Sequence, residues 1–167
     1  MIEEPDWLQW HTSYDAESSS LWRRLQFVQN QIRAVLDTRA GTPTRIISAC
    51  AGKGRDLIEV VAKHAARDSV QALLIERAPD VAAVARRSIA RHALRNFSVA
   101  ECDAGLSDAY ATHVPSDLLL FCGVFAWISE DEMFRAIDFL PRLAAPRATV
   151  RRSSSLSAEN GSAASNA

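Results

Sequence analysis

The feature that most constrains this fold is the run at residues 45–61, in which β-branched residues lead into small residues and then into a helical pattern. A buried strand that feeds a glycine-containing turn and a helix leaves backbone N–H groups facing outward, where a ligand can approach the chain closely. The run therefore predicts a strand, a turn at residues 49–54, a helix from Arg55, and a nucleoside-like ligand at the turn.

Two common glycine-rich loops do not match this turn. A phosphate-binding P-loop needs Ser or Thr after Gly-Lys to hold magnesium, but Gly54 follows Lys53. A dinucleotide fingerprint needs a third glycine, and Leu57 stands at that position, which leaves an NAD-dependent enzyme as a distant third interpretation. Two alternatives remain for the turn itself: a surface for an adenosyl group, or a tight strand-to-helix turn without a ligand.

Two further predicted strands lead to carboxylates. The apolar run at residues 70–75 ends at Glu76, and the run at residues 97–101 leads to Asp103. In nucleotide-binding βαβ units, an acid about 20 residues beyond the glycine loop accepts hydrogen bonds from the ribose hydroxyls. The alternative for Glu76 is a solvated residue that only ends a strand. Because the carboxyl ends of parallel strands meet at one edge of a sheet, both acids are expected near the turn.

With these residues the chain resembles the class I S-adenosylmethionine-dependent methyltransferases. It is most similar to a bacterial branch whose first motif reads like Ser-x-Cys-Ala-Gly-x-Gly-Arg-Asp, which here is residues 48–56. An Asp-Ala element at residues 103–104 and a strand that ends in residues 122–125 also match, and the resemblance runs from about Trp7 to Val150.

The resemblance implies S-adenosylmethionine as the cofactor. Gly52 and Gly54 would line its methionine part, Glu76 would hold the ribose, and Asp103 would meet the adenine amino group. Cys122 and Gly123 would close the pocket near the sulfonium. The cofactor-binding residues that the resemblance implies are Ser48, Cys50, Ala51, Gly52, Gly54, Glu76, Asp103, Ala104, Cys122 and Gly123.

The chain departs from the family pattern at three places. Ser48 stands where the first motif usually opens with an acid, and Cys50 replaces the first of three glycines. A hydroxyl can still accept a hydrogen bond, and a thiol is small. Relatives tend to carry Gly-Asn where this chain has Ala126-Trp127. A tryptophan there is expected to narrow the substrate channel.

The N-terminal segment, residues 1–40, is predicted to be a lid that ends in an amphipathic helix. The catalytic residues are unknown, and His11 and Tyr14 on the lid are the candidates for a general base. The alternative is that they pack in an aromatic cluster with Trp7 and Trp10.

The alternating pattern predicts an α/β fold: a Rossmann-like, mostly parallel sheet with helices on both faces, at residues 41–150. Residues 151–167 are rich in Ser and Ala and are predicted to be a disordered tail. The usual C-terminal strands of the family are not predicted, so we expect a truncated or frameshifted member. An uncovered sheet edge favours self-association.

The composition limits which binding partners are expected. A formal net charge of −1 gives no electrostatic argument for nucleic acid, and three cysteines fit reduced thiols better than a metal site or a disulfide framework. No signal segment or membrane span is predicted, so the expected location is the cytoplasm. The predicted function is methyl transfer to a small-molecule acceptor. The alternative is a catalytically inactive remnant or a cofactor-binding interaction module.

Overall fold

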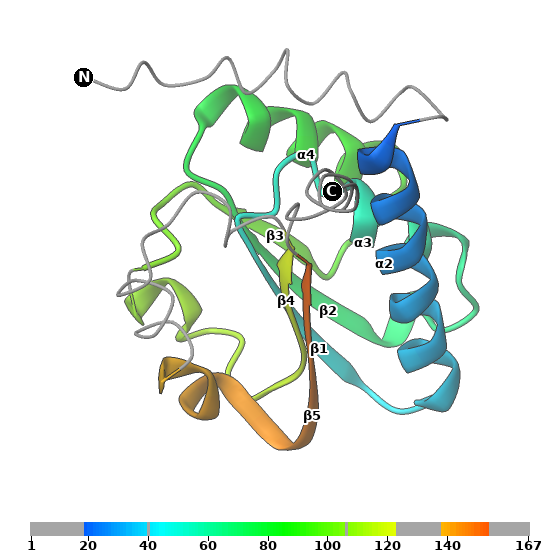
Figure 1. The fold of residues 1–167 in the computed structure, drawn as a ribbon, viewed down its shortest axis with the longest axis vertical. Helices are drawn as coiled ribbons and strands as arrows, with labels where there is room; N and C mark the ends of the chain where they lie inside the picture. Colours follow the sequence, from blue (N-terminus) through cyan, green and yellow to red (C-terminus); the bar gives the residue numbers. More distant parts are fainter. Residues whose placement is uncertain (1–18, 40, 106, 123–137, 154–167) are drawn as a thin grey trace, which may run out of the picture.

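A computed structural model describes residues 19–39, 41–105, 107–122 and 138–153 of the chain (Figure 1). Its centre is a parallel sheet of five strands in the order β3-β2-β1-β4-β5. The strands are β1 (Thr44–Ala49), β2 (Val70–Ile75), β3 (Phe97–Ala100), β4 (Ser116–Cys122) and β5 (Ala144–Ser153). Both β1 and β2 are buried at five of six positions, as expected for strands that are covered on both faces.

Three helices pack on one face of the sheet (Figure 1). They are α2 (Ser20–Thr38), α3 (Arg55–Lys63) and α4 (Pro79–Arg91). Helix α2 begins after Ser19, whose hydroxyl accepts a hydrogen bond from the backbone N–H of Trp22 at 3.0 Å. Its apolar stripe, which includes the fully buried Ile32, joins a core cluster with Ile46 of β1 and Leu118 of β4. The amphipathic helix predicted from the sequence is therefore confirmed.

The opposite face of the sheet holds a second core cluster. Here Ile47 and Leu119 pack with Tyr110, at the end of the 3-10 helix η3 (Ser107–Tyr110), and with Leu143. Leu143 ends a helical stretch at residues 138–143 that leads directly into β5. The predicted fold class, a parallel α/β sheet with helical structure on both faces, is confirmed.

The strand order reverses direction between β1 and β4. In open α/β sheets of this kind, ligands bind beyond the carboxyl ends of the strands at such a switch point. The predicted turn at residues 49–54 follows β1 and therefore lies at this position.

The helix predicted from Arg55 begins there and ends at Lys63, because the backbone of His64 is extended, and a short 3-10 helix, η2 (Arg67–Ser69), follows. The tail was expected to begin at residue 151, but β5 continues to Ser153 through pairing with β4. Ladder hydrogen bonds to β4 outweigh the low apolar content of these residues. Within the described ranges, no strand follows β5.

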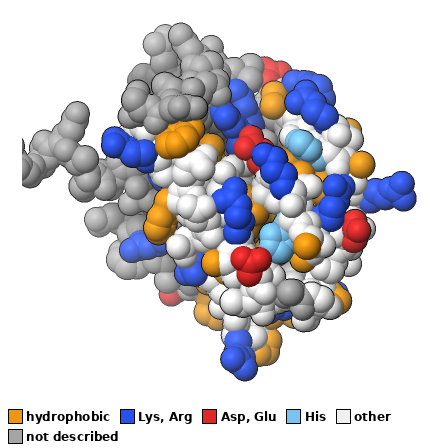
Figure 2. All heavy atoms as spheres, turned by 90° about the vertical axis from the view of Figure 1, so that its right-hand side faces the viewer, with side chains coloured by type: hydrophobic (Ala, Val, Ile, Leu, Met, Phe, Trp, Pro, Cys, Tyr) orange, Lys and Arg blue, Asp and Glu red, His pale blue; other side chains and the backbone are white. Residues whose placement is uncertain are grey.

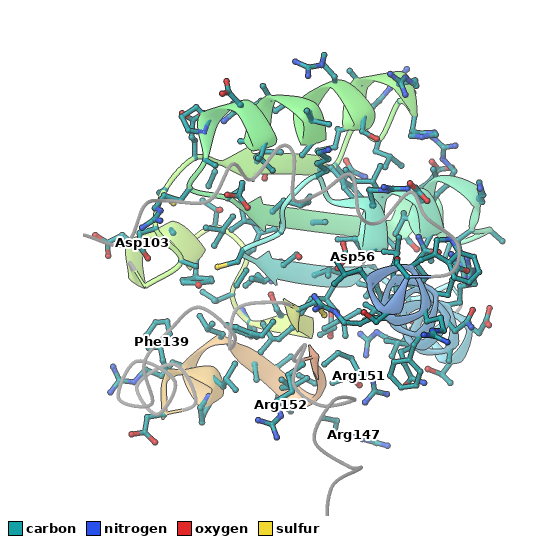
Figure 3. All side chains as sticks on the ribbon, turned by 45° about the horizontal axis from the view of Figure 1, so that its top comes forward. Asp56, Asp103, Phe139, Arg147, Arg151 and Arg152 are labelled. Atoms are coloured by element: carbon teal, nitrogen blue, oxygen red, sulfur yellow. The ribbon has the colours of Figure 1, made fainter. Side chains whose placement is uncertain are left out.

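Strand β5 forms one edge of the described sheet and is rich in arginine. Arg151 and Arg152 pair with successive residues of β4 and point to opposite sides of the sheet (Figure 3). Arg147 lies on the same strand. Two copies that paired through this edge would bring like charges together, and charged side chains are a common protection of sheet edges. Self-association through an uncovered edge stays a prediction.

Candidate functional site

The turn after β1 contains three residues in the left-handed backbone region. They are Cys50 (φ 49°), Gly52 (φ 58°) and Gly54 (φ 68°). Glycine adopts this conformation freely, whereas a residue with a side chain loses roughly 1 kcal/mol there. Cys50 occupies the position of the family's first glycine. Its backbone nevertheless adopts the left-handed conformation that a glycine would adopt freely.

Gly54 closes the turn and begins α3. Its N–H donates to the carbonyl of Ala51 at 2.9 Å, and its own carbonyl accepts from the N–H of Ile58 at 2.8 Å. A Cβ atom at this position would lie 2.6 Å from side-chain atoms of both Ile58 and Leu74. A side chain at this position would therefore force the ends of the Ile58 and Leu74 side chains to shift, in addition to the strain of the left-handed backbone.

Glu76 follows β2 and holds the turn with its carboxylate. Oε2 accepts a hydrogen bond from the N–H of Gly52, and Oε1 accepts one from the N–H of Ala78, both at 2.9 Å. The backbone N–H of Glu76 donates to Ala100 at the end of β3, at 3.0 Å. The prediction that Glu76 lies beside the turn is confirmed, but its carboxylate is a structural partner of the turn as well as a ligand candidate.

Asp103 lies beyond the end of β3, at the carboxyl end of the parallel sheet, as does the turn after β1 (Figure 3). It is exposed, and its Oδ1 accepts a hydrogen bond from the N–H of Gly105 at 2.7 Å. Tyr110 donates its hydroxyl to the carbonyl of Ala104. Tyr110 was not predicted as part of the site. Its position depends on the 3-10 helix η3, for which the sequence carries no periodic signal.

The environment of the turn disfavours ionisation of the Cys50 thiol. The pKa of the Cys50 thiol is raised to about 11, first by burial of the sulfur and then by the charges of Glu76 and Asp103, while Arg77 opposes them. Cys50 as a residue is exposed. Its thiolate is disfavoured first by the loss of solvent around the sulfur and then by the two carboxylates. The carboxylates also favour a cationic ligand.

The other predicted cofactor residues are placed as follows. Ser48 is 2 % exposed within β1 and shares a face with Ile46, toward the helices α2 and α3. Ala51 is half-buried in the turn, and Cys122 is half-buried at the end of β4. Gly123, Trp127, His11 and Tyr14 lie outside the described residues, so the predictions made for them stay predictions.

Asp56 is a half-buried acid at the start of α3 that the site prediction did not include. Its Oδ1 accepts from the N–H of Leu57 at 2.9 Å. Burial raises its pKa to about 6, against the hydrogen bonds and the opposite charge of Arg24, which lower it. Figure 3 places Asp56 beside α2, apart from Asp103.

No protein-family model and no curated protein sequence matches the chain. Solved structures do match. A S-adenosylmethionine-dependent methyltransferase from Geobacter sulfurreducens, in complex with S-adenosyl-L-homocysteine, has a TM-score of 0.58 and 18 % identity, over 90 % of this chain and 55 % of that one. The PH0226 protein from Pyrococcus horikoshii OT3 has a TM-score of 0.58 and 12 % identity, over 81 % and 55 %. A Clostridium thermocellum protein named for rRNA methylation has a TM-score of 0.57 and 11 % identity, over 72 % and 65 %.

The chain thus has the fold of the class I S-adenosylmethionine-dependent methyltransferases, which confirms the resemblance seen in the sequence at the level of fold. The predicted cofactor agrees with the S-adenosyl-L-homocysteine bound in the Geobacter sulfurreducens structure. The chain spans less than two-thirds of the length of these three proteins.

The described residues contain no cluster of three or more His, Cys, Asp or Glu side chains that could hold a metal ion. None of the three cysteines forms a disulfide; Cys50 is exposed, and Cys102 and Cys122 are half-buried against the core clusters. Among the helices that are described, none is long and apolar enough to cross a membrane.

Basic side chains gather on the side of the molecule where α2 lies (Figure 2). The guanidinium of Arg67 connects the ends of α3 and α4. It donates to the carbonyl of Ala62 at 3.2 Å and to that of His92 at 2.8 Å. Cations at helix C-termini offset the negative end of the helix dipole.

The fold neighbours are named for rRNA and for precorrin substrates. The absence of a nucleic-acid partner therefore stays a prediction.

Proposed function

We propose that this chain binds S-adenosylmethionine at the turn after β1 and transfers its methyl group to a small-molecule acceptor. The observation that carries the proposal is the position of Glu76, whose carboxylate accepts a hydrogen bond from the N–H of Gly52 in the turn at 2.9 Å, with the exposed Asp103 at the same end of the sheet. S-adenosylmethionine bears a positive sulfonium, whereas a dinucleotide would bring two negative phosphates to the same place.

The residues present fit this cofactor. Glu76 supplies carboxylate oxygens for ribose hydroxyls, and Asp103 is exposed and able to accept from an adenine amino group. Gly52 and Gly54 allow the left-handed backbone of the turn, and Gly54 in addition lets α3 pack closely on the sheet, so that the N–H groups of the turn lie at the proposed site. Ser48, Ala51, Ala104, Cys122 and Gly123 complete the proposed site.

When bound, the cofactor would supply an activated methyl group with a good leaving group. The task of the chain is then to hold the acceptor in line at near-attack distance and to exclude water. A general base is needed only where the acceptor must lose a proton early, and His11 and Tyr14 are the proposed candidates.

The test is release of S-adenosylhomocysteine from S-adenosylmethionine during incubation with fractionated small-molecule extracts. We expect one fraction to stimulate release, and Glu76→Ala to abolish it. Tight cofactor binding without release in any fraction would contradict the enzyme and favour the cofactor-binding module instead.

A further inference from the structure

Tyr110 connects the second core cluster to the turn that carries Asp103. The side chain is 2 % exposed, and its ring lies 5.9 Å from that of Phe139, centroid to centroid, at an interplanar angle of 59°. The ring is therefore held by packing from a part of the chain that leads into β5. Its hydroxyl donates to the carbonyl oxygen of Ala104.

One peptide group is fixed at both of its ends by this arrangement. The carbonyl of Ala104 and the N–H of Gly105 belong to the same planar peptide unit, so neither can turn without the other. Tyr110 holds the oxygen, and the N–H donates to Oδ1 of Asp103 at 2.7 Å. A hydrogen bond to the carbonyl also polarises the peptide and strengthens its N–H as a donor.

We propose that Tyr110 is a positioning residue for the adenine end of the cofactor, acting through the Ala104–Gly105 peptide on the carboxylate of Asp103. This inference rests on the proposed function. The bond from Gly105 takes one acceptor position of the Asp103 carboxylate and leaves Oδ2 for the exocyclic amino group of adenine. Asp103 is exposed, so without this anchor its side chain would sample several rotamers and bind adenine with a larger loss of entropy.

The pKa of Tyr110 agrees with a role as a hydrogen-bond donor close to Asp103. The pKa of Tyr110 is raised by burial and by the nearby groups Cys50, Cys102 and Asp103, so the hydroxyl keeps its proton and remains a donor at neutral pH. The phenol thus reaches the region where the turn after β1 and the end of β3 meet.

The experiment is calorimetric titration of wild-type protein, Tyr110→Phe and Ser116→Ala with S-adenosylhomocysteine and with S-inosylhomocysteine. The inosyl ligand carries a carbonyl where adenine carries its amino group. Ser116→Ala is the matched control, because it also removes a buried hydroxyl, which donates to the carbonyl of His113 at the amino end of β4 and not to that of Ala104.

Wild-type protein should prefer the adenosyl over the inosyl ligand by about tenfold or more. Tyr110→Phe should bind S-adenosylhomocysteine roughly tenfold more weakly and lose most of that preference, whereas Ser116→Ala should keep both. In the free protein, the Gly105 amide should exchange its hydrogen faster in Tyr110→Phe only.

A purely structural tyrosine would lower stability and leave the ratio between the two ligands unchanged, and that result would overturn the inference. A wild-type protein that does not distinguish the two ligands would overturn it as well, whether or not Tyr110→Phe folds. A wild-type protein that binds neither ligand would refute the proposed function itself and this inference with it.

Discussion

The carboxylate of Glu76 accepts a hydrogen bond from the backbone N–H of Gly52 at 2.9 Å, across 24 residues of sequence. Its other oxygen binds the N–H of Ala78 at the start of α4. The acid thus ties the turn after β1 to the end of β2. Each oxygen keeps a further lone pair, so the same carboxylate can accept ribose hydroxyls without releasing the turn.

Glu76→Ala should weaken both ligand binding and the fold. Two backbone N–H groups lose a charged partner, so we expect the free energy of unfolding to fall by roughly 2 kcal/mol and the affinity for S-adenosylhomocysteine to fall by at least about tenfold. Urea unfolding and calorimetric titration measure the two effects.

The matched control is Glu101→Ala, which removes an exposed ion pair with Arg86 at 2.9 Å. It should cost under about 1 kcal/mol and leave ligand affinity unchanged. If Glu76→Ala bound the ligand as tightly as wild type, the ribose assignment would be wrong.

Gly54→Ala should destabilise the chain through a steric conflict. The new Cβ would lie 2.6 Å from Ile58 and Leu74, in a left-handed backbone conformation. The control is Gly41→Ala, because Gly41 has a similar φ of 78° but no atom within 4 Å of its Cβ position. Both variants carry the backbone strain, so urea unfolding should show Gly54→Ala to be less stable by a further 1–3 kcal/mol or so. Equal losses would mean that the side chains of Ile58 and Leu74 can shift to make room for the methyl group.

Asp56 should make stability depend on pH. Its pKa is raised to about 6 in the folded protein, above the value of 3.8 for an unperturbed Asp, so folding binds a proton between these values. Stability is therefore lost as the pH rises from about 4 to 6, by at most about 3 kcal/mol.

Asp56→Asn removes this titration and keeps an oxygen for the N–H of Leu57. Relative to wild type, the variant should gain stability between pH 4.5 and pH 7.5, measured by urea unfolding at both values. A difference between the two proteins that stays constant over this range would show that Asp56 titrates normally.

Cys50 should react slowly with iodoacetamide. With a pKa of about 11, its thiolate fraction at neutral pH is on the order of 100-fold below that of an ordinary thiol, and higher intrinsic nucleophilicity recovers about tenfold of this. Trypsin releases Cys50 in residues 46–53, which contain no other cysteine. The alkylation rate of this peptide in the folded protein should still rise at pH 10. A half-maximal rate near pH 9, as expected for the unfolded protein, would show that the pKa of Cys50 is not raised.

The parts of the fold and site that the sequence predicts are those with strong local patterns. β4 is recognisable because residues 118–121 are all apolar, and Glu76 because it ends a buried strand at the right distance from Gly54. The left-handed backbone of Cys50 also had a usable signal, since it occupies a glycine position of the motif.

Other features depend on contacts between distant segments. The residues at the end of β5 are polar, and only their pairing with β4 makes them a strand. Tyr110 reaches the carbonyl of Ala104 because η3 turns the chain and Phe139 packs against the ring. Neither arrangement has a periodic signature in the sequence.

The most direct test of the central claim is calorimetric titration of the purified chain with S-adenosylhomocysteine, with NADH as the comparison ligand. The account predicts a single site with micromolar or tighter affinity, about −8 kcal/mol or better, and no heat with NADH, because Leu57 stands where a dinucleotide-binding loop needs its third glycine. Binding of NADH with equal or greater affinity, or no binding of S-adenosylhomocysteine to a sample shown to be folded, would contradict it.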